Sequence, residues 1–162
     1  MNFAKNKLIR ILQNAHAGEL AAARAYNGHW KSVRDPKQKE EIRRIELEEL
    51  DHRERVRGWL SKLGSAPRPA REKVFGAIGS ALGVLCHVSG WFLPMYFAGR
   101  LESQNTEEYK EAAAYAKELG LDECVADLLD MSAVELEHEE YFRSVIAGHF
   151  LLRPAKVFFR WS

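Results

Sequence analysis

The chain has 162 residues, enough for one domain with a sizeable hydrophobic core. Its 24 basic and 23 acidic residues nearly cancel, and the net charge of +1 excludes the basic footprint of a nucleic-acid-binding protein. The two cysteines, Cys86 and Cys124, lack C-x-x-C spacing, so we expect an intracellular protein without a disulfide framework or a thiolate metal site.

The first predicted helix covers residues 3–33 and carries one acidic residue on its apolar stripe. Apolar side chains recur there three and four residues apart, which is typical of a helix with one buried face. They are Leu8, Leu12, Ala15, Ala22, Tyr26 and Trp30. Glu19 occupies a position of this stripe where a leucine is expected. The helix ends at Asp35-Pro36, because proline disfavours the α conformation in the residue before it.

The second predicted helix covers residues 37–63, and its buried face also carries polar residues. The apolar members of the stripe are Ile42, Ile45, Val56, Trp59 and Leu63. Glu49 and His52 replace apolar residues in the middle of it, and their spacing of three places them on one face. The other glutamates lie off the stripe and alternate with arginines, which is typical of a solvated face. They are Glu40, Glu41, Glu46, Glu48 and Glu54.

Residues 64–93 form a long connection whose second part is uncharged. The stretch from Val74 to Ala98 has no charged residue, and by length alone it is a candidate membrane span. A span there would place Glu49 and Glu102 on opposite sides of ~30 Å of hydrocarbon, and glycines and Pro94 interrupt it. We therefore expect a crossover helix that packs on a bundle and offers apolar surface to a bilayer or a lipid substrate.

Two further helices are predicted, over residues 94–120 and 122–149. The apolar stripe of the first selects Glu102 as its inward carboxylate; its other members are Ala98, Asn105, Tyr109, Ala112, Ala116 and Leu119. The stripe of the second contains Glu135 and His138 among Leu128, Met131, Phe142 and Val145. The two halves of the chain thus repeat one plan, a helix with a buried Glu followed by a helix with a buried Glu-x-x-His.

This repetition predicts an all-α, ferritin-like four-helix bundle with a dinuclear carboxylate site and a long apolar crossover between its second and third helices. The predicted metal ligands are Glu19, Glu49, His52, Glu102, Glu135 and His138. Two divalent cations would balance four carboxylates that are otherwise costly to bury. Oxygen and imidazole donors without thiolate suit two iron ions, with manganese as the alternative. A single Glu-x-x-His in so glutamate-rich a sequence is often a surface coincidence, but two copies on apolar stripes argue against that.

Residues 150–162 form a tail that we treat apart from the bundle of residues 1–149. It mixes aromatic and cationic residues, as segments that anchor proteins at a membrane interface do. The alternative is that the tail docks on the bundle or on a partner subunit. Among other residues, His16 and Tyr109 suit either a place beside the ligands or the core, and His29, His87 and His149 follow no pattern.

Several motifs together resemble one protein family, the demethoxyubiquinone hydroxylases, over nearly the whole chain. The first is His16-Ala17-Gly18-Glu19, followed by Arg24, Tyr26 and Gly28. The others, in matching order and spacing, are Glu49-Leu50-Asp51-His52, Arg68-Pro69, the interval from Glu102 to Tyr109, and Glu135-Leu136-Glu137-His138.

The resemblance implies a di-iron monooxygenase that hydroxylates the ring of a polyprenyl benzoquinone during ubiquinone synthesis, with the six predicted ligands binding iron. Its partners would be a lipid-tailed quinone, O2, an external electron donor and the membrane surface, with the protein peripheral on the cytoplasmic side. Assembly into a homo-oligomer stays open.

Two other functions suit the same predicted site. One is rubrerythrin-like peroxide reduction or ferroxidase activity, which fast peroxide turnover without quinone would favour. The other is a non-enzymatic, membrane-associated iron-binding protein, which would consume no oxygen with any reductant.

Overall fold

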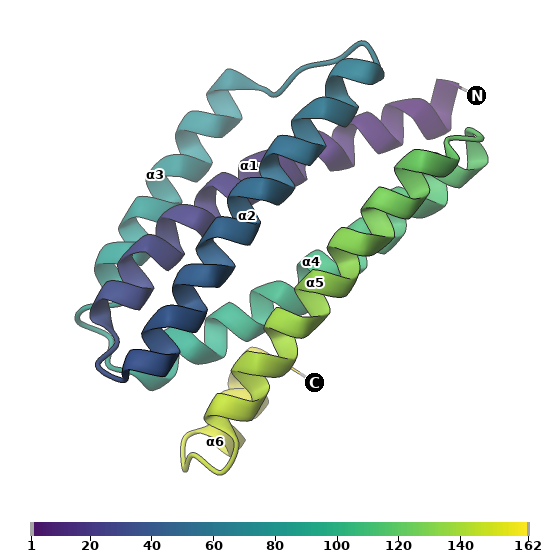
Figure 1. The fold of residues 1–162 in the computed structure, drawn as a ribbon. Helices are drawn as coiled ribbons and strands as arrows, with labels where there is room; N and C mark the ends of the chain where they lie inside the picture. The colour runs from purple at the N-terminus through teal and green to yellow at the C-terminus, as the bar shows by residue number, and fades with distance from the viewer. Residues whose placement is uncertain (1, 162) are drawn as a thin grey trace.

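The computed structural model describes residues 2–161, and all six elements in that range are helices. They are α1 (Asn2–Ser32), α2 (Pro36–Lys62), α3 (Pro69–Leu85), α4 (Phe92–Glu118), α5 (Asp122–Ile146) and α6 (Leu152–Phe159). Four long helices form the bundle as two hairpins, α1 with α2 and α4 with α5 (Figure 1). The prediction of an all-α, ferritin-like bundle is confirmed.

Helix boundaries follow local chemistry that was visible in the sequence. Asp35 caps α2, because its side chain accepts a hydrogen bond from the backbone N–H of Gln38 at 2.9 Å, and Pro36 occupies the first helical position. The last bundle helix ends three residues earlier than predicted, at Ile146. Ala147 adopts an extended ψ of 130° and Gly148 a φ of +80°, which stops the helix there.

The crossover helix α3 runs beside α1 (Figure 1). It packs against α1 through glycines. Gly76, Gly79 and Gly83 are its buried residues. A Cβ atom on Gly79 would collide with the backbone of Ala21, so only glycine permits this close approach. Since the contact face is made of glycine, the larger apolar side chains of α3 point outward. These exposed residues are Val74, Ile78, Leu82, Val84 and Leu85.

No helix within residues 2–161 is both long enough and apolar enough to be a candidate membrane span.

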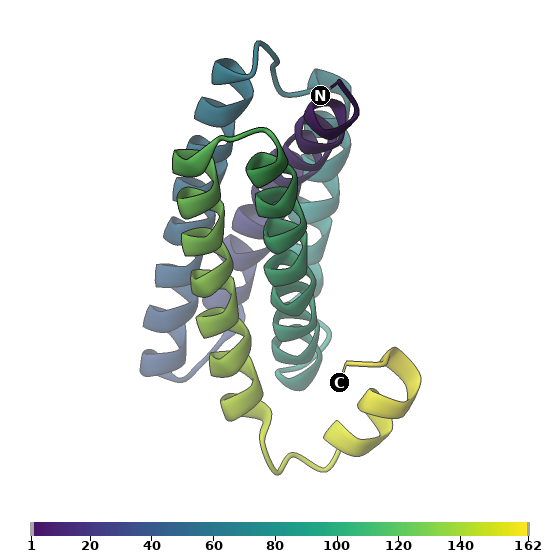
Figure 2. The same ribbon diagram turned by 90° about the vertical axis from the view of Figure 1, so that its right-hand side faces the viewer.

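The tail folds back as α6 beneath the end of the bundle (Figure 2). Ala155 and Trp161 are buried there, and the hydroxyl of Tyr96 donates a hydrogen bond to the carbonyl of Ala155 at 3.1 Å. The opposite side of the tail is open, since Val157 and Phe158 are 78% and 79% exposed. One face of the tail therefore docks on the bundle, which was the alternative for this segment. The opposite, apolar face is uncovered.

The hydrophobic core consists of two clusters, one toward each end of the bundle. On α1, Ala15 belongs to one cluster and Ala22 to the other; on α5, Met131 and Phe142 are divided in the same way. Glu19 lies between the first pair in sequence, and Glu135 and His138 lie between the second. The polar residues on the apolar stripes thus form a buried layer at mid-bundle.

Candidate metal centre

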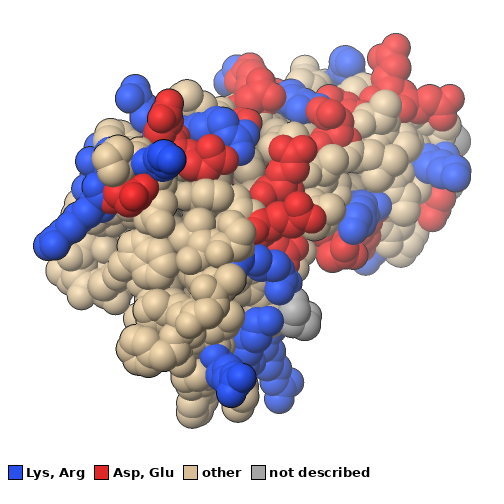
Figure 3. Space-filling view, turned by 60° about the horizontal axis from the view of Figure 1, so that its bottom comes forward, with Lys and Arg blue, Asp and Glu red and all other residues tan. Residues whose placement is uncertain are grey.

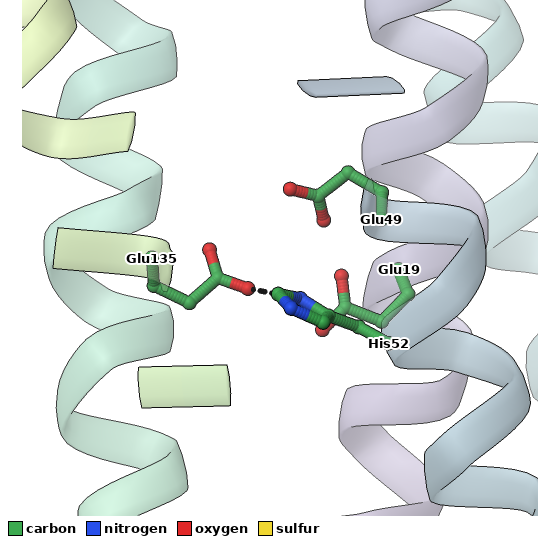
Figure 4. A group of neighbouring side chains, drawn as sticks. All are labelled: Glu19, Glu49, His52 and Glu135. Atoms are coloured by element: carbon green, nitrogen blue, oxygen red, sulfur yellow. Dashed lines mark hydrogen bonds and ion pairs between the residues drawn. The ribbon is translucent and has the colours of Figure 1, made fainter. Parts of the chain in front are cut away.

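The structure brings all six predicted ligands together in this layer, at the centre of four helices. None of them is more than 2% exposed. Figure 4 shows four of them: Glu19 from α1 and Glu49 and His52 from α2 face Glu135 from α5. Nδ1 of His52 lies 2.8 Å from a carboxylate oxygen of Glu135, which connects the two hairpins across the bundle.

The side chains divide into two overlapping groups, each with ligand atoms close enough for one metal ion. The first group is Glu19, Glu49, His52 and Glu135; the second is Glu49, Glu102, Glu135 and His138. Within each group the ligand atoms lie within 4.8 Å of one another. Glu49 and Glu135 belong to both groups. They therefore lie where carboxylates that bridge two cations are expected.

Several fully buried atoms of this layer have no hydrogen-bond partner among the residues that the structure describes. They include both carboxylate oxygens of Glu49, one oxygen each of Glu19 and Glu135, and Nδ1 of His138. A buried polar atom without a partner is costly, and native proteins rarely leave several in one place. Bound cations would supply the missing partners, so the residues fit a dinuclear metal centre.

Without metal, the negative charges of the neighbouring carboxylates in this layer repel one another. Burial first, and then repulsion by neighbouring carboxylates, raises the pKa of Glu19, Glu49 and Glu102 well above the ordinary 4.5. Burial also works to raise the pKa of Glu135, but its interactions with the imidazoles of His138 and His52 outweigh burial and lower that pKa. Metal-free protein therefore holds protons on carboxyl groups where cations would otherwise bind.

These shifts predict that metal-free protein loses stability as the pH rises from about 4.5. Above that value the unfolded chain releases the protons of Glu19, Glu49 and Glu102, while the folded state retains them. Because the folded state binds more protons than the unfolded chain, the free energy of unfolding falls as the pH rises. We expect the melting temperature of metal-free protein to be higher at pH 5.5 than at pH 8.

Addition of Mn²⁺ or anaerobic Fe²⁺ should reverse that trend, because ligands deprotonate as metal binds. The measurement is a thermal melt across this pH range with and without metal. Metal-free protein whose melting temperature climbs with pH would contradict the assignment of these three carboxyl groups.

Further side chains hydrogen-bond the predicted ligands, among them two tyrosines and Glu48. The hydroxyl of Tyr109 donates a hydrogen bond to Glu19, and that of Tyr26 donates one to Glu102. Both tyrosines were predicted on apolar stripes, but their partners on other helices were not. Nε2 of His138 lies 2.8 Å from Glu48, which leaves Nδ1 facing Glu49 at 3.4 Å.

The prediction of a solvated face was wrong for two glutamates of α2. Glu48 orients His138, and Glu46 accepts hydrogen bonds from Asn27 at 2.7 Å and from the indole of Trp30 at 2.6 Å. Their partners lie on other helices, so the α2 sequence contained no signal that could have singled them out. His16, the other residue left open, hydrogen-bonds Glu72 of α3 at 2.8 Å.

An apolar cavity of about 290 Å³ lies between α1, α3 and α4, beside the polar layer. Tyr26 and His29 of α1 contribute to its wall, together with Leu82 and Leu85 of α3 and Phe97 of α4. Because the hydroxyl of Tyr26 bonds Glu102, one side chain separates the cavity from a predicted ligand. The cavity is close to the lower end of the volumes typical of small-molecule sites.

Comparison with known proteins identifies a family for this chain. Residues 6–144, nearly the whole bundle, match the family model described as ubiquinone biosynthesis protein COQ7. Searches of curated proteins and of solved structures return no match. The matched range contains all six residues of the polar layer. The chain therefore belongs to the COQ7 family of ubiquinone biosynthesis proteins.

Proposed function

We propose that the protein is a di-iron monooxygenase that hydroxylates the ring of a lipid-tailed benzoquinone in ubiquinone synthesis. The observation that carries the proposal is the pair of overlapping ligand groups that share Glu49 and Glu135. Bound iron would supply the activation of O2, which the side chains of this chain do not provide themselves. Family membership supports the quinone as substrate.

The reaction replaces a ring C–H bond by C–OH. One atom of O2 enters the ring as hydroxyl and the other leaves as water, which consumes two electrons and two protons from an external donor. The protein must therefore admit an apolar ring, hold it near the metal centre and exclude bulk water. Six ligands that are almost completely buried satisfy the last requirement.

Each predicted ligand has a place in this proposal. Glu19 and His52 would hold one iron ion, and Glu102 and His138 would hold the other. Glu49 and Glu135 would bridge the two. Two histidines for two metals leave coordination positions open for O2 or substrate. Glu48 would keep Nδ1 of His138 directed at its metal by accepting the proton of Nε2.

The proposed substrate route is the cavity between α1, α3 and α4. Its wall is almost entirely apolar, and it opens beside the exposed side chains of Leu82, Leu93 and Phe97. A quinone ring in the cavity would lie next to Tyr26, with its prenyl tail directed to the surface.

The surface around this entrance supports a peripheral membrane association as part of the proposal. Figure 3 shows a broad face without charged side chains, with lysine and arginine side chains along its lower right edge. Exposed apolar side chains near the start of α4 and on the tail include Val88, Phe150 and Phe158, and the tail also carries Lys156 and Arg160. Apolar side chains flanked by cations are typical of segments that lie in a bilayer interface.

Vesicle binding tests this association. The double variant Val157→Ser, Phe158→Ser should reduce binding to anionic lipid vesicles about tenfold or more, because two side chains that would enter the acyl region become polar. Flotation of protein with vesicles measures the effect. Leu129→Ser, at an exposed apolar site on α5, is the control and should bind normally. Equal binding by the tail variant and the control would contradict a role for the tail.

Turnover tests the proposed reaction itself. Reduced, iron-loaded protein is given O2 and a demethoxy-benzoquinone with a short prenyl tail, and we expect a ring-hydroxylated product with one oxygen atom from ¹⁸O2. Absence of this product with ample reductant would contradict the proposal. Fast peroxide consumption without quinone would instead indicate a rubrerythrin-like reaction, and no oxygen consumption a non-enzymatic iron-binding protein.

A further inference from the structure

One buried side chain in the substrate cavity has no role in the metal centre. His29 is 3% exposed and contributes to the cavity wall, and within residues 2–161 its Nε2 atom has no hydrogen-bond partner. Native proteins rarely leave a buried polar atom without a partner, so an unpartnered atom on a side chain that lines a cavity points to a ligand. His29 lies three residues after Tyr26, so both side chains project from the same face of α1.

The surroundings of His29 select the chemistry of that ligand. Its ring stacks against Tyr26 at a centroid distance of 6.3 Å and against Phe142 at 6.1 Å. Burial lowers the pKa of His29 to about 4, so the imidazole is neutral near pH 7. A neutral imidazole has one N–H donor and one acceptor nitrogen. An uncharged aromatic or quinonoid ring that carries oxygen atoms fits this place, whereas an anion does not.

We propose that His29 hydrogen-bonds a ring oxygen of the quinone substrate and thereby positions the ring beside Tyr26 and Glu102. The inference rests on the proposed function and assigns a positioning residue to it. In one tautomer of the neutral imidazole Nε2 carries the proton and would donate to the carbonyl of a quinone. In the other tautomer Nε2 is unprotonated and would accept from the hydroxyl of the corresponding hydroquinone. One residue thus serves both oxidation states of the substrate, while the leucines and Phe97 enclose the apolar remainder.

The test measures binding rather than turnover. Full-length protein is titrated without reductant with a demethoxy-benzoquinone carrying a short prenyl tail, and quenching of tryptophan fluorescence gives Kd. His29→Phe should raise Kd about tenfold, the usual effect of one lost hydrogen bond, and His29→Gln should retain most of the affinity. His87→Phe, at an exposed histidine outside the cavity wall, should match the wild type.

Infrared spectroscopy supplies a readout that a purely structural role would not change. In the wild-type complex a carbonyl band of the bound quinone should lie at lower frequency than in an apolar solvent, and His29→Phe should restore the unbonded frequency. An unshifted band in the wild type would overturn the inference even if His29→Phe failed to fold.

The remaining outcomes separate this inference from the proposed function. If His29→Phe binds the quinone as tightly as wild type with the same carbonyl band, His29 is not the partner, and the hydroxylase proposal stands. If wild-type protein binds no quinone, both are overturned.

Discussion

Replacement of Glu135 by alanine should abolish the binding of both metal ions rather than one. Glu135 belongs to both overlapping ligand groups and contacts His52 at 2.8 Å. We expect the number of Fe²⁺ ions bound per chain in anaerobic titration to fall from two to nearly zero, and hydroxylation to fall below detection. The affinity should drop by more than about 100-fold, since loss of an outer partner alone costs 10–100-fold.

Two comparisons make this result specific. Glu137→Ala, two residues away on the exposed face of α5, should still bind two ions. Glu19→Ala removes a residue that belongs to one group only, and should leave one ion bound more tightly than the other. Retention of two ions by Glu135→Ala would show that Glu135 is not shared between two metals.

Replacement of Gly79 by leucine should separate α3 from α1 and abolish quinone binding. A side chain at this position would meet the backbone of Ala21, which cannot move without displacing the helix. Overpacking of this kind should lower the free energy of unfolding by about 2–3 kcal/mol. Leu82 and Leu85 would move with α3, and with them one wall of the proposed substrate cavity.

The metal centre should survive the Gly79→Leu change, because no predicted ligand lies on α3. Urea unfolding, quinone titration and metal analysis of the same sample measure the three effects. Gly58→Ala is the matched control: it lies in the interior of α2 with open space around it, and should raise stability by about 0.5–1 kcal/mol. Normal quinone binding by Gly79→Leu would contradict the location of the cavity as the substrate site.

The sequence was sufficient to predict the bundle and the residues of the polar layer because both depend on helical periodicity. Glu19 and Glu102 stood out only because each interrupts an apolar stripe, and the Glu-x-x-His pairs because i and i+3 share a face. These signals lie within single helices. They required no knowledge of how the helices pack, apart from the rule that apolar stripes face one another.

Features that depend on contacts between helices were not predictable in the same way. The partner of Glu48 is His138 of α5, 90 residues away, so on α2 alone Glu48 resembled a solvated glutamate. The sequence of α3 predicted an apolar crossover but not its orientation. Its buried face consists of glycines, so the apolar side chains that would ordinarily mark the inner face lie outside.

The proposed role of His29 could not be predicted from the sequence either. Its position in the sequence follows no ligand spacing, and only the packed structure reveals a buried imidazole with an unpartnered nitrogen in an apolar wall. Tyr26 was predicted as a core residue, and it is one, but its hydroxyl also reaches Glu102. A residue that serves both packing and the site cannot be recognised from hydropathy alone.

The most direct test of the metal centre is anomalous X-ray diffraction at the iron edge from crystals of iron-loaded protein. We predict two iron peaks about 3.5–4 Å apart, the usual separation in two-metal sites, with Glu49 and Glu135 between them. A single peak, or iron bound away from these two glutamates, would contradict a dinuclear centre at the middle of the bundle.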